Sequence, residues 1–261
     1  MFTFPVPWGG KRALAQAIAD TGRILMPGFD RSGDGNHRAM STTASTAQPF
    51  VPDSDDLGRL AAAVQDCHGC DLYRRATQAV FGAGDRSARV MFVGEQPGDA
   101  EDRAGLPFVG PAGRVFDDVL ARAGIVRSTT YVTNAVKHFR WKSTDNGPRR
   151  LHQNPTTRQI TACAPWLTAE LSAVRPRVVV ALGATAGKAL FGTRFKVTEQ
   201  HGTVLRWPPE RGPFAGSEIA LDGAMATIHP SAVLRTRGAE DRRAALDGMV
   251  ADLSILADLL S

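Results

Sequence analysis

The sequence predicts an α/β fold, a three-layer α/β/α sandwich around a central, mainly parallel sheet of four strands. Four short runs of apolar, β-branched residues recur along the chain, at residues 89–94, 130–136, 177–183 and 224–229. Each run is continuous rather than alternating in polarity, which is typical of strands buried on both faces of a parallel sheet. Helical segments separate the runs, and this alternation indicates a layered α/β architecture.

Five segments are predicted to be helices: residues 55–65, 113–123, 156–174, 184–191 and 240–260. Gly124, a typical C-cap residue, ends the second of them. Pro176 follows the third, as expected because a residue before proline avoids helical geometry. The loop over residues 208–218 is expected inside a hairpin that joins residues 204–206 to residues 219–221.

The N-terminal segment differs from the rest of the chain. Residues 1–53 mix Gly, Pro, Ser and Thr with scattered charges, a composition that buries too little to offset its ordering entropy. We therefore expect residues 1–53 to be a disordered leader and residues 54–261 to form one domain. The chain is 43% apolar, which is ordinary for a globular protein with a full core.

Charge and hydropathy narrow the class of protein. No window approaches the roughly 18 uninterrupted apolar residues of a spanning helix, and the N-terminus lacks the layout of a signal peptide. We expect a cytoplasmic protein, a monomer by default, with no membrane partner.

Lys and Arg number 31 against 26 acidic residues, and the sequence pI is about 9.5. This excess fits a polyanionic partner but is weak evidence by itself.

The chain has three cysteines, Cys67, Cys70 and Cys163. An odd number without an export signal argues against a disulfide framework. The first two form Cys-x-x-Cys, which in a reducing compartment indicates metal or redox chemistry more often than packing. Three buried free thiols are the alternative.

Polar residues gather where three of the predicted strands end. In a parallel sheet the carboxyl ends of the strands meet at one edge, and ligands bind there. Any one of these residues could merely cap a strand or turn, but together they predict a crevice. They are Glu95, Gln96 and Asp99 after the first strand, Asn134 at the end of the second, and His229 and Ser231 after the fourth.

These residues belong to four ordered motifs that resemble those of the uracil-DNA glycosylase superfamily, most of all its iron–sulfur branch (family 4 and relatives). The motifs are Gly-Glu-Gln-Pro-Gly at residues 94–98, Gly-Leu-Pro-Phe-Val-Gly-Pro-Ala-Gly at 105–113, Thr-Asn-Ala-Val-Lys at 133–137 and His-Pro-Ser at 229–231. The resemblance covers about residues 57–260. It implies the fold of that superfamily and removal of uracil from DNA.

One loop resembles a narrower group. Residues 147–155, Gly-Pro-Arg-Arg-Leu-His-Gln-Asn-Pro, are similar to the Lys-Arg-Arg-Ile-His insertion of the UdgX branch, whose members become covalently attached to DNA where the uracil was excised. Pro148 stands in place of the Lys and Leu151 in place of the Ile. The arginine pair and His152 are kept, so the same chemistry is expected.

The resemblance implies a [4Fe–4S] cluster. Family-4 relatives hold it with four cysteines; here Cys67, Cys70 and Cys163 would be ligands, and His138 stands where the remaining cysteine would follow Asn-Ala-Val-Lys. Mixed Cys/His ligation of iron is known chemistry. A zinc site uses the same donors and stays open, and His68 is a rival fourth ligand. The cluster's expected role is architectural.

The resemblance also implies roles in uracil release. Phe108 is expected to stack on the extruded base, and Asn134 to read its O4 and N3–H edge, since an amide donates and accepts side by side. His229 and backbone N–H groups near Gln96 are expected to hydrogen-bond O2 as negative charge builds there. The predicted substrate-binding residues are Phe108, Asn134, Gln96, Arg150 and Ser231.

On the other face of the sugar, Glu95 and Asp99 would stabilise the developing positive charge or position water. A neutral imidazole of His152 at C1′ would capture the cation in place of water, with Glu95 the candidate carboxylate for its far nitrogen. Arg149 and Arg150 suit phosphate contacts. On composition alone, His152 beside two arginines would be a solvated loop residue; the resemblance reverses that interpretation.

The predicted activity is therefore excision of uracil from single- or double-stranded DNA by a nucleoid-associated enzyme that becomes linked to C1′ through His152 and acts once. Leu234 or Val233 could wedge into the vacated stack, and the helix start at residues 110–113 could receive a phosphate. The alternatives are a glycosylase that turns over and a non-catalytic binder of damaged DNA. A nucleotide-binding protein is disfavoured, because both Gly-x-Gly-x-x-Gly and Gly-Lys-Ser/Thr are missing.

Overall fold

The computed structural model describes residues 45–144 and 147–260. Most of the predicted leader, residues 1–44, lies outside the described residues. Its last part packs on the domain: a 3-10 turn, η1 (Gln48–Phe50), follows Ala47, which is buried and whose N–H donates to the carbonyl of Ala162 at 2.7 Å. The packed part of the chain therefore begins before residue 54.

The core of the domain is one six-stranded sheet in the order β1-β3-β2-β6-β8-β7. Its four inner strands run parallel and coincide with the four predicted strands. Every residue in them is buried, which explains their continuous apolar runs. They are β3 (Tyr131–Asn134), β2 (Val90–Gly94), β6 (Val178–Leu182) and β8 (Gly223–Thr227).

Two antiparallel edge strands correct the predicted count of four. β1 (Ala83–Gly84) pairs with β3, and β7 (Val204–Leu205) pairs with β8. Each is two residues long, too short to produce a periodic pattern. The predicted hairpin between residues 204–206 and 219–221 is wrong, because β7 takes β8 as its partner. Trp207 joins the two segments instead, donating from Nε1 to the carbonyl of Ile219 at 2.8 Å.

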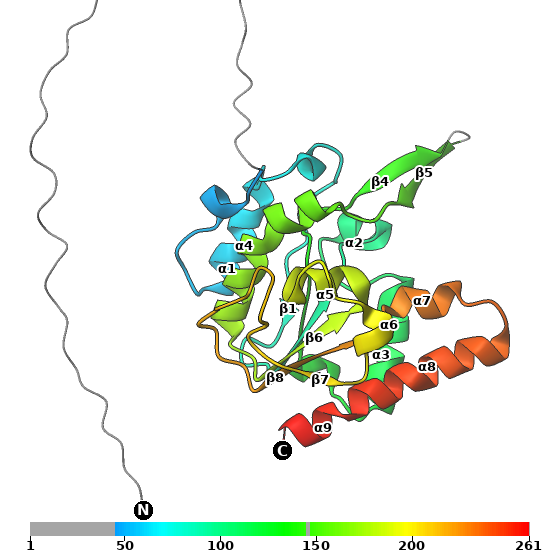
Figure 1. Cartoon of the computed structure of the whole chain (residues 1–261). Helices are drawn as coiled ribbons and strands as arrows, with labels where there is room; N and C mark the ends of the chain where they lie inside the picture. The colour runs from blue at the N-terminus through cyan, green and yellow to red at the C-terminus, as the bar shows by residue number, and fades with distance from the viewer. Residues whose placement is uncertain (1–44, 145–146, 261) are drawn as a thin grey trace, which may run out of the picture. The chain divides into compact units, whose positions relative to one another are not determined.

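Helices cover both faces of the sheet, as predicted (Figure 1). One face packs against α1 (Leu57–Ala63), α4 (Thr157–Val174) and α5 (Gly183–Phe191). The other packs against α3 (Pro111–Arg122), α8 (Ala239–Ser254) and α9 (Leu256–Leu260). Successive side chains of β2 point to opposite faces of the sheet. Met91 and Val93 therefore pack on the face covered by α1, α4 and α5, whereas Val90 and Phe92 pack on the face covered by α3, α8 and α9. The fold is therefore a three-layer α/β/α sandwich.

The remaining elements are short. The 3-10 turns are η2 (Val64–Asp66), η3 (Asp71–Arg74) and η4 (Arg127–Thr129), and the short helices are α2 (Asp99–Ala104), α6 (Val197–Gln200) and α7 (Pro230–Arg235). Among the described residues, no helix has both the length and the apolar character to cross a bilayer.

A separate two-stranded hairpin, β4 (Trp141–Thr144) and β5 (Gly147–His152), replaces the loop predicted around His152. In Figure 1 it extends away from the central sheet. Trp141 lies directly opposite His152 in its register. The hairpin thus ends, at its root, on the residue for which the sequence predicts covalent chemistry.

A buried polar network fixes the end of β3. Lys137 and Glu170, both buried, form an ion pair, and Lys137 Nζ also donates to the carbonyl of Asn134 at 2.7 Å. Glu170 lies on α4 and accepts from the hydroxyls of Tyr131 and Thr133 at 3.1 and 2.8 Å. Because a buried charge is stable only when it is paired and hydrogen-bonded, this network ties β3 to α4 at the point where Asn134 leaves the sheet.

Candidate active site

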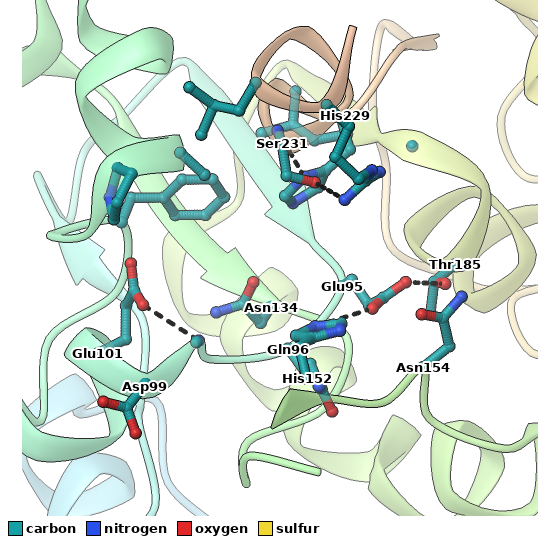
Figure 2. Close-up of a pocket in the computed structure, with 18 of the residues that line it drawn as sticks. Glu95, Gln96, Asp99, Glu101, Asn134, His152, Asn154, Thr185, His229 and Ser231 are labelled. Carbon is teal, nitrogen blue, oxygen red and sulfur yellow. Dashed lines mark hydrogen bonds and ion pairs between the residues drawn. The ribbon is translucent and has the colours of Figure 1, made fainter. Parts of the chain in front are cut away.

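A cavity of about 990 Å³ opens at the carboxyl ends of the central strands, the edge that the sequence predicts (Figure 2). Its walls come from the turns after β2, β6 and β8, from the end of β3 and from the root of the β4–β5 hairpin. The predicted site residues that line it are Glu95, Gln96, Asp99, Phe108, Asn134, His152, His229 and Ser231. Arg150 and the four predicted cluster ligands lie outside this lining.

Glu95 and His152 face each other across the cavity. The Nε2 atom of His152 lies 3.2 Å from Oε1 of Glu95, and the hydroxyl of Thr185 donates to Oε2 (Figure 2). Burial lowers the pKa of His152 below its ordinary value of 6.5 despite the attraction of Glu95, and Arg235 lowers it further. The ring is therefore neutral at physiological pH. A neutral ring that keeps its proton on Nε2, toward the carboxylate, has its free lone pair on Nδ1.

His229 has the opposite arrangement of ring nitrogens. Its Nδ1 accepts the backbone N–H of Ser231 at 3.1 Å and lies 2.7 Å from the Ser231 hydroxyl oxygen. Burial, together with the charge of Arg235, lowers the pKa of His229 to about 4. A neutral ring that accepts at Nδ1 must carry its proton on Nε2. His229 is therefore a hydrogen-bond donor on its free side.

Phe108 and Asn134 meet over Gly94, the last residue of β2. A Cβ atom on Gly94 would lie 2.4 Å from Oδ1 of Asn134 and 2.7 Å from Cζ of Phe108, so only glycine fits there. Phe108 has a φ of 58°, an unusual conformation for a residue with a side chain. Its carbonyl oxygen would lie 1.8 Å from a Cβ on Gly113. Both glycines of the motifs thus let the aromatic ring and the amide share one pocket.

Arg150 has partners other than the phosphate predicted for it. Its side chain is only 10% exposed and forms ion pairs with Asp99 and Asp102 of α2. Burial raises the pKa of Asp99, but hydrogen bonds from Arg103 and Arg150 outweigh it and leave that pKa lowered. Arg150 therefore anchors the hairpin to α2, and the exposed Arg149 is the freer of the two for a phosphate. Asp99 lines the cavity with its carboxylate shared between two guanidinium groups.

Gln96 has its side chain committed to the hairpin root. Its Nε2 donates to the carbonyls of Arg140 and Gln153 at 3.2 and 3.0 Å, and its Oε1 accepts the N–H of Arg140 at 3.1 Å. Any contact to a base would come from backbone N–H groups, as the sequence predicts.

Val233 and Leu234 are the two residues predicted to insert into the vacated base stack. Val233 is buried and Leu234 is 42% exposed, so Leu234 is the one available at the surface.

Sequence reasoning missed two residues that position this site. Glu101 accepts the N–H of Gly98 at 3.1 Å and that of Gly110 at 2.8 Å, joining the two glycine-rich loops. Its position three residues after Gly98 is the spacing of a capping box, a signal that could have found it. Thr185 follows the third predicted strand, and the carboxyl end of that strand was itself a signal.

The three cysteines are free thiols; Cys163 belongs to α4, and the charges of Cys67 and Cys70 act on it. Trp166 Nε1 is 3.1 Å from Sγ of Cys67, and the N–H of Lys137 donates to Sγ of Cys163 at 3.3 Å. Burial raises the pKa of the Cys163 thiol to about 12, and the other two thiols add to the rise. Burial also raises the pKa of Cys70.

His138 is adjacent to Lys137, and burial lowers its pKa to about 4. Its imidazole is therefore neutral, the form that binds metals. No three His, Cys, Asp or Glu side chains within the described ranges are placed to hold a metal ion. The rival ligand His68 stacks on Tyr73, with ring centroids 4.1 Å apart.

Comparison with known proteins agrees with this geometry. The family model "Uracil DNA glycosylase superfamily" matches residues 81–254. The chain is 35% identical over 180 residues to a type-4 uracil-DNA glycosylase of Pyrobaculum aerophilum, covering 69% of this chain and 85% of that protein. It is 35% identical over 185 residues to the type-4 enzyme of Thermotoga maritima, covering 70% and 86%. A type-5 uracil-DNA glycosylase of Pyrobaculum aerophilum is 30% identical over 177 residues, covering 60% and 74%. This chain belongs to the uracil-DNA glycosylase superfamily.

Proposed function

We propose that this protein excises uracil from DNA and that His152 then captures the sugar, leaving the protein covalently attached at C1′. The observation that carries the proposal is the pairing of a neutral His152 with Glu95 inside the cavity, 3.2 Å apart. His201 also faces a carboxylate, but His152 is the one of these two histidines that lines the cavity. The type-4 relatives support the excision step, and the contacts of His152 support the capture.

Excision requires that the uracil anion be stabilised as it leaves the sugar. As the C1′–N1 bond breaks, its electron pair leaves with the base, and the charge spreads onto O2. The Nε2–H of His229, its orientation fixed by Ser231, would donate to that oxygen, and one such donor can contribute about 3–4 kcal/mol. Phe108 would stack on the base. Asn134, buried and held at the end of β3, would hydrogen-bond the O4 and N3–H edge that distinguishes uracil from cytosine.

Capture follows on the opposite face of the sugar. The negative charge of Glu95 would stabilise the sugar cation, and the lone pair on Nδ1 of His152 would form the new bond to C1′. The positive charge then resides on the imidazole, whose Nε2–H already faces Glu95, and the uracil anion takes a proton from water. Positioning the nucleophile inside the site gives it a large advantage over bulk water.

A denaturing gel with a uracil-containing oligonucleotide tests the capture. The wild-type protein should give a band that migrates as protein plus DNA, and His152→Ala should abolish it while retaining release of uracil within about tenfold, because His229 and Asn134 are untouched. His201→Ala is the matched control, since His201 is also 45% exposed and also faces a carboxylate, Asp252 at 3.1 Å, away from the cavity. Released uracil in molar excess over protein, without a slow band, would instead identify a glycosylase that turns over.

The pH profile of capture should follow the neutral form of His152. Burial lowers the pKa of His152 below 6.5, so the single-turnover rate of adduct formation should fall as the pH is lowered, with a midpoint below pH 6.5. His229, with a pKa of about 4, stays neutral over this range. Glu95→Gln removes an influence that raises the pKa, so the midpoint should move to lower pH. A midpoint at or above pH 6.5 in the wild type would contradict the proposal.

Gly94→Ala tests the base pocket. A methyl group there would collide with Asn134 and Phe108, and displacing both by about 1 Å should lower the rate of uracil release about 100-fold or more. Gly248→Ala on α8 is the matched control, because its Cβ would have no neighbour within 4 Å. Near wild-type release by a folded Gly94→Ala protein would show that these two side chains do not hold the base.

We also propose that Cys67, Cys70, His138 and Cys163 hold a [4Fe–4S] cluster. The donor set fits: the thiols of Cys67 and Cys70 act on the pKa of Cys163 of α4, and the imidazole of His138 is neutral. Each ligand of such a cluster binds a different iron, so the ligands need not converge on one point as they must around zinc. When bound, the group would join the Cys67–Cys70 segment to α4, a structural contribution.

Metal analysis of the purified protein tests this assignment. We expect a brown protein with about four irons and four sulfides per chain, and loss of both in Cys163→Ala. His138→Cys should retain them because thiolate is the usual ligand, and His68→Ala is a matched control that should also retain them. A colourless protein that contains zinc without sulfide would refute the cluster.

A further inference from the structure

The β4–β5 hairpin that carries His152 needs anchors beyond its own hydrogen bonds. Its described residues form a two-stranded sheet that is not paired with the central sheet, and an isolated hairpin of this size is marginally stable in water. Gln96 clamps only its root. The direction in which His152 points must therefore depend on side chains that dock the hairpin on the domain.

One face of the hairpin carries these side chains. Trp141 is directly opposite His152, and Arg150, two residues before His152, is opposite Ser143. Opposite residues of an antiparallel pair share a face, and diagonal neighbours on it are within reach of an aromatic side chain. Trp141, Arg150 and His152 therefore lie on the same side, the side on which Arg150 meets Asp99 and His152 meets Glu95.

Two guanidinium groups lie over the ring of Trp141. Cζ of Arg75 is 4.3 Å from the centroid of the Trp141 ring and Cζ of Arg150 is 5.5 Å from it, both within the range of a cation–π interaction. The indole Nε1 also donates to the carbonyl of Arg75 at 2.9 Å. Arg75 caps η3, which begins directly after Cys70. The tryptophan thus ties the hairpin to the segment of the chain that follows the Cys-x-x-Cys motif.

We propose that Trp141 is a positioning residue for the capture step: held by Arg75 and Arg150, it docks the hairpin so that His152 stays opposite Glu95. The inference rests on the proposed function for its catalytic consequence. Its structural consequence is independent of that function: without Trp141, the hairpin opens more often while the α/β core is unchanged.

Amide hydrogen exchange without DNA, and the ratio of adduct to released uracil, test the proposal together. In Trp141→Ala the amides of β4 and β5 should exchange about tenfold faster while those of β2 and β6 are unchanged, and the ratio of adduct to released uracil should fall about tenfold. Trp141→Phe keeps an aromatic ring for the guanidinium groups but loses the pyrrole ring with its Nε1–H, so it should restore part of both effects. Lys142→Ala, on the opposite face of β4, should match the wild type.

Unchanged exchange of the hairpin amides in Trp141→Ala would overturn the proposal, and so would faster exchange with an unchanged ratio of adduct to uracil. Failure of the proposed function looks different. A wild-type protein that releases uracil but forms no adduct would refute capture by His152. The exchange experiment, which needs no DNA, would then still decide whether Trp141 docks the hairpin.

Discussion

The carboxylate of Glu95 is the point on which the arrangement of the site depends. One of its oxygens accepts from Thr185 at the start of α5, and the other faces His152 at the end of β5. Thr185 comes this close because β6 passes directly into α5 at Gly183, whose φ is 88°. A Cβ at Gly183 would also lie 2.8 Å from Cβ of His229. The same turn therefore brings the carboxylate's partner and the second histidine to one cavity.

Two neutral imidazoles in one cavity receive opposite roles from their partners. His229 accepts from Ser231 through Nδ1 and keeps a proton on Nε2, whereas His152 turns Nε2 toward Glu95, so a proton held there would leave the lone pair on Nδ1. Burial lowers the pKa of both, and the proximity of His152 lowers that of His229 further. Under the proposed function, the site would place a hydrogen-bond donor where an anion develops and a nucleophile where a cation develops, and neither imidazole would carry a buried charge.

The sequence predicted the parts of the fold that follow from local patterning. Strands buried on both faces read as continuous apolar runs, and their polar ends marked the cavity. The β4–β5 hairpin has no such pattern, since Trp141 and Arg150 are held by residues far away in the sequence, Arg75 and Asp99. Thr185 was missed although it follows the third predicted strand, because its partner Glu95 lies 90 residues away in the sequence. The role of His152 came from the resemblance alone, because no local property of the loop distinguishes it from a solvated histidine.

The hairpin, rather than the α/β core, decides how the proposed reaction ends. Gln96 follows Glu95 directly, and its side chain donates to the carbonyls of Arg140 and Gln153, the residues that flank the hairpin at its root. The carboxylate and the segment that presents the imidazole are therefore fixed by consecutive residues. An imidazole on an unclamped loop would retain the freedom that proximity must remove, and water at its bulk concentration would compete for the cation. In the proposed reaction, capture in place of hydrolysis would thus require both the contacts of Gln96 at the base of the hairpin and the imidazole of His152.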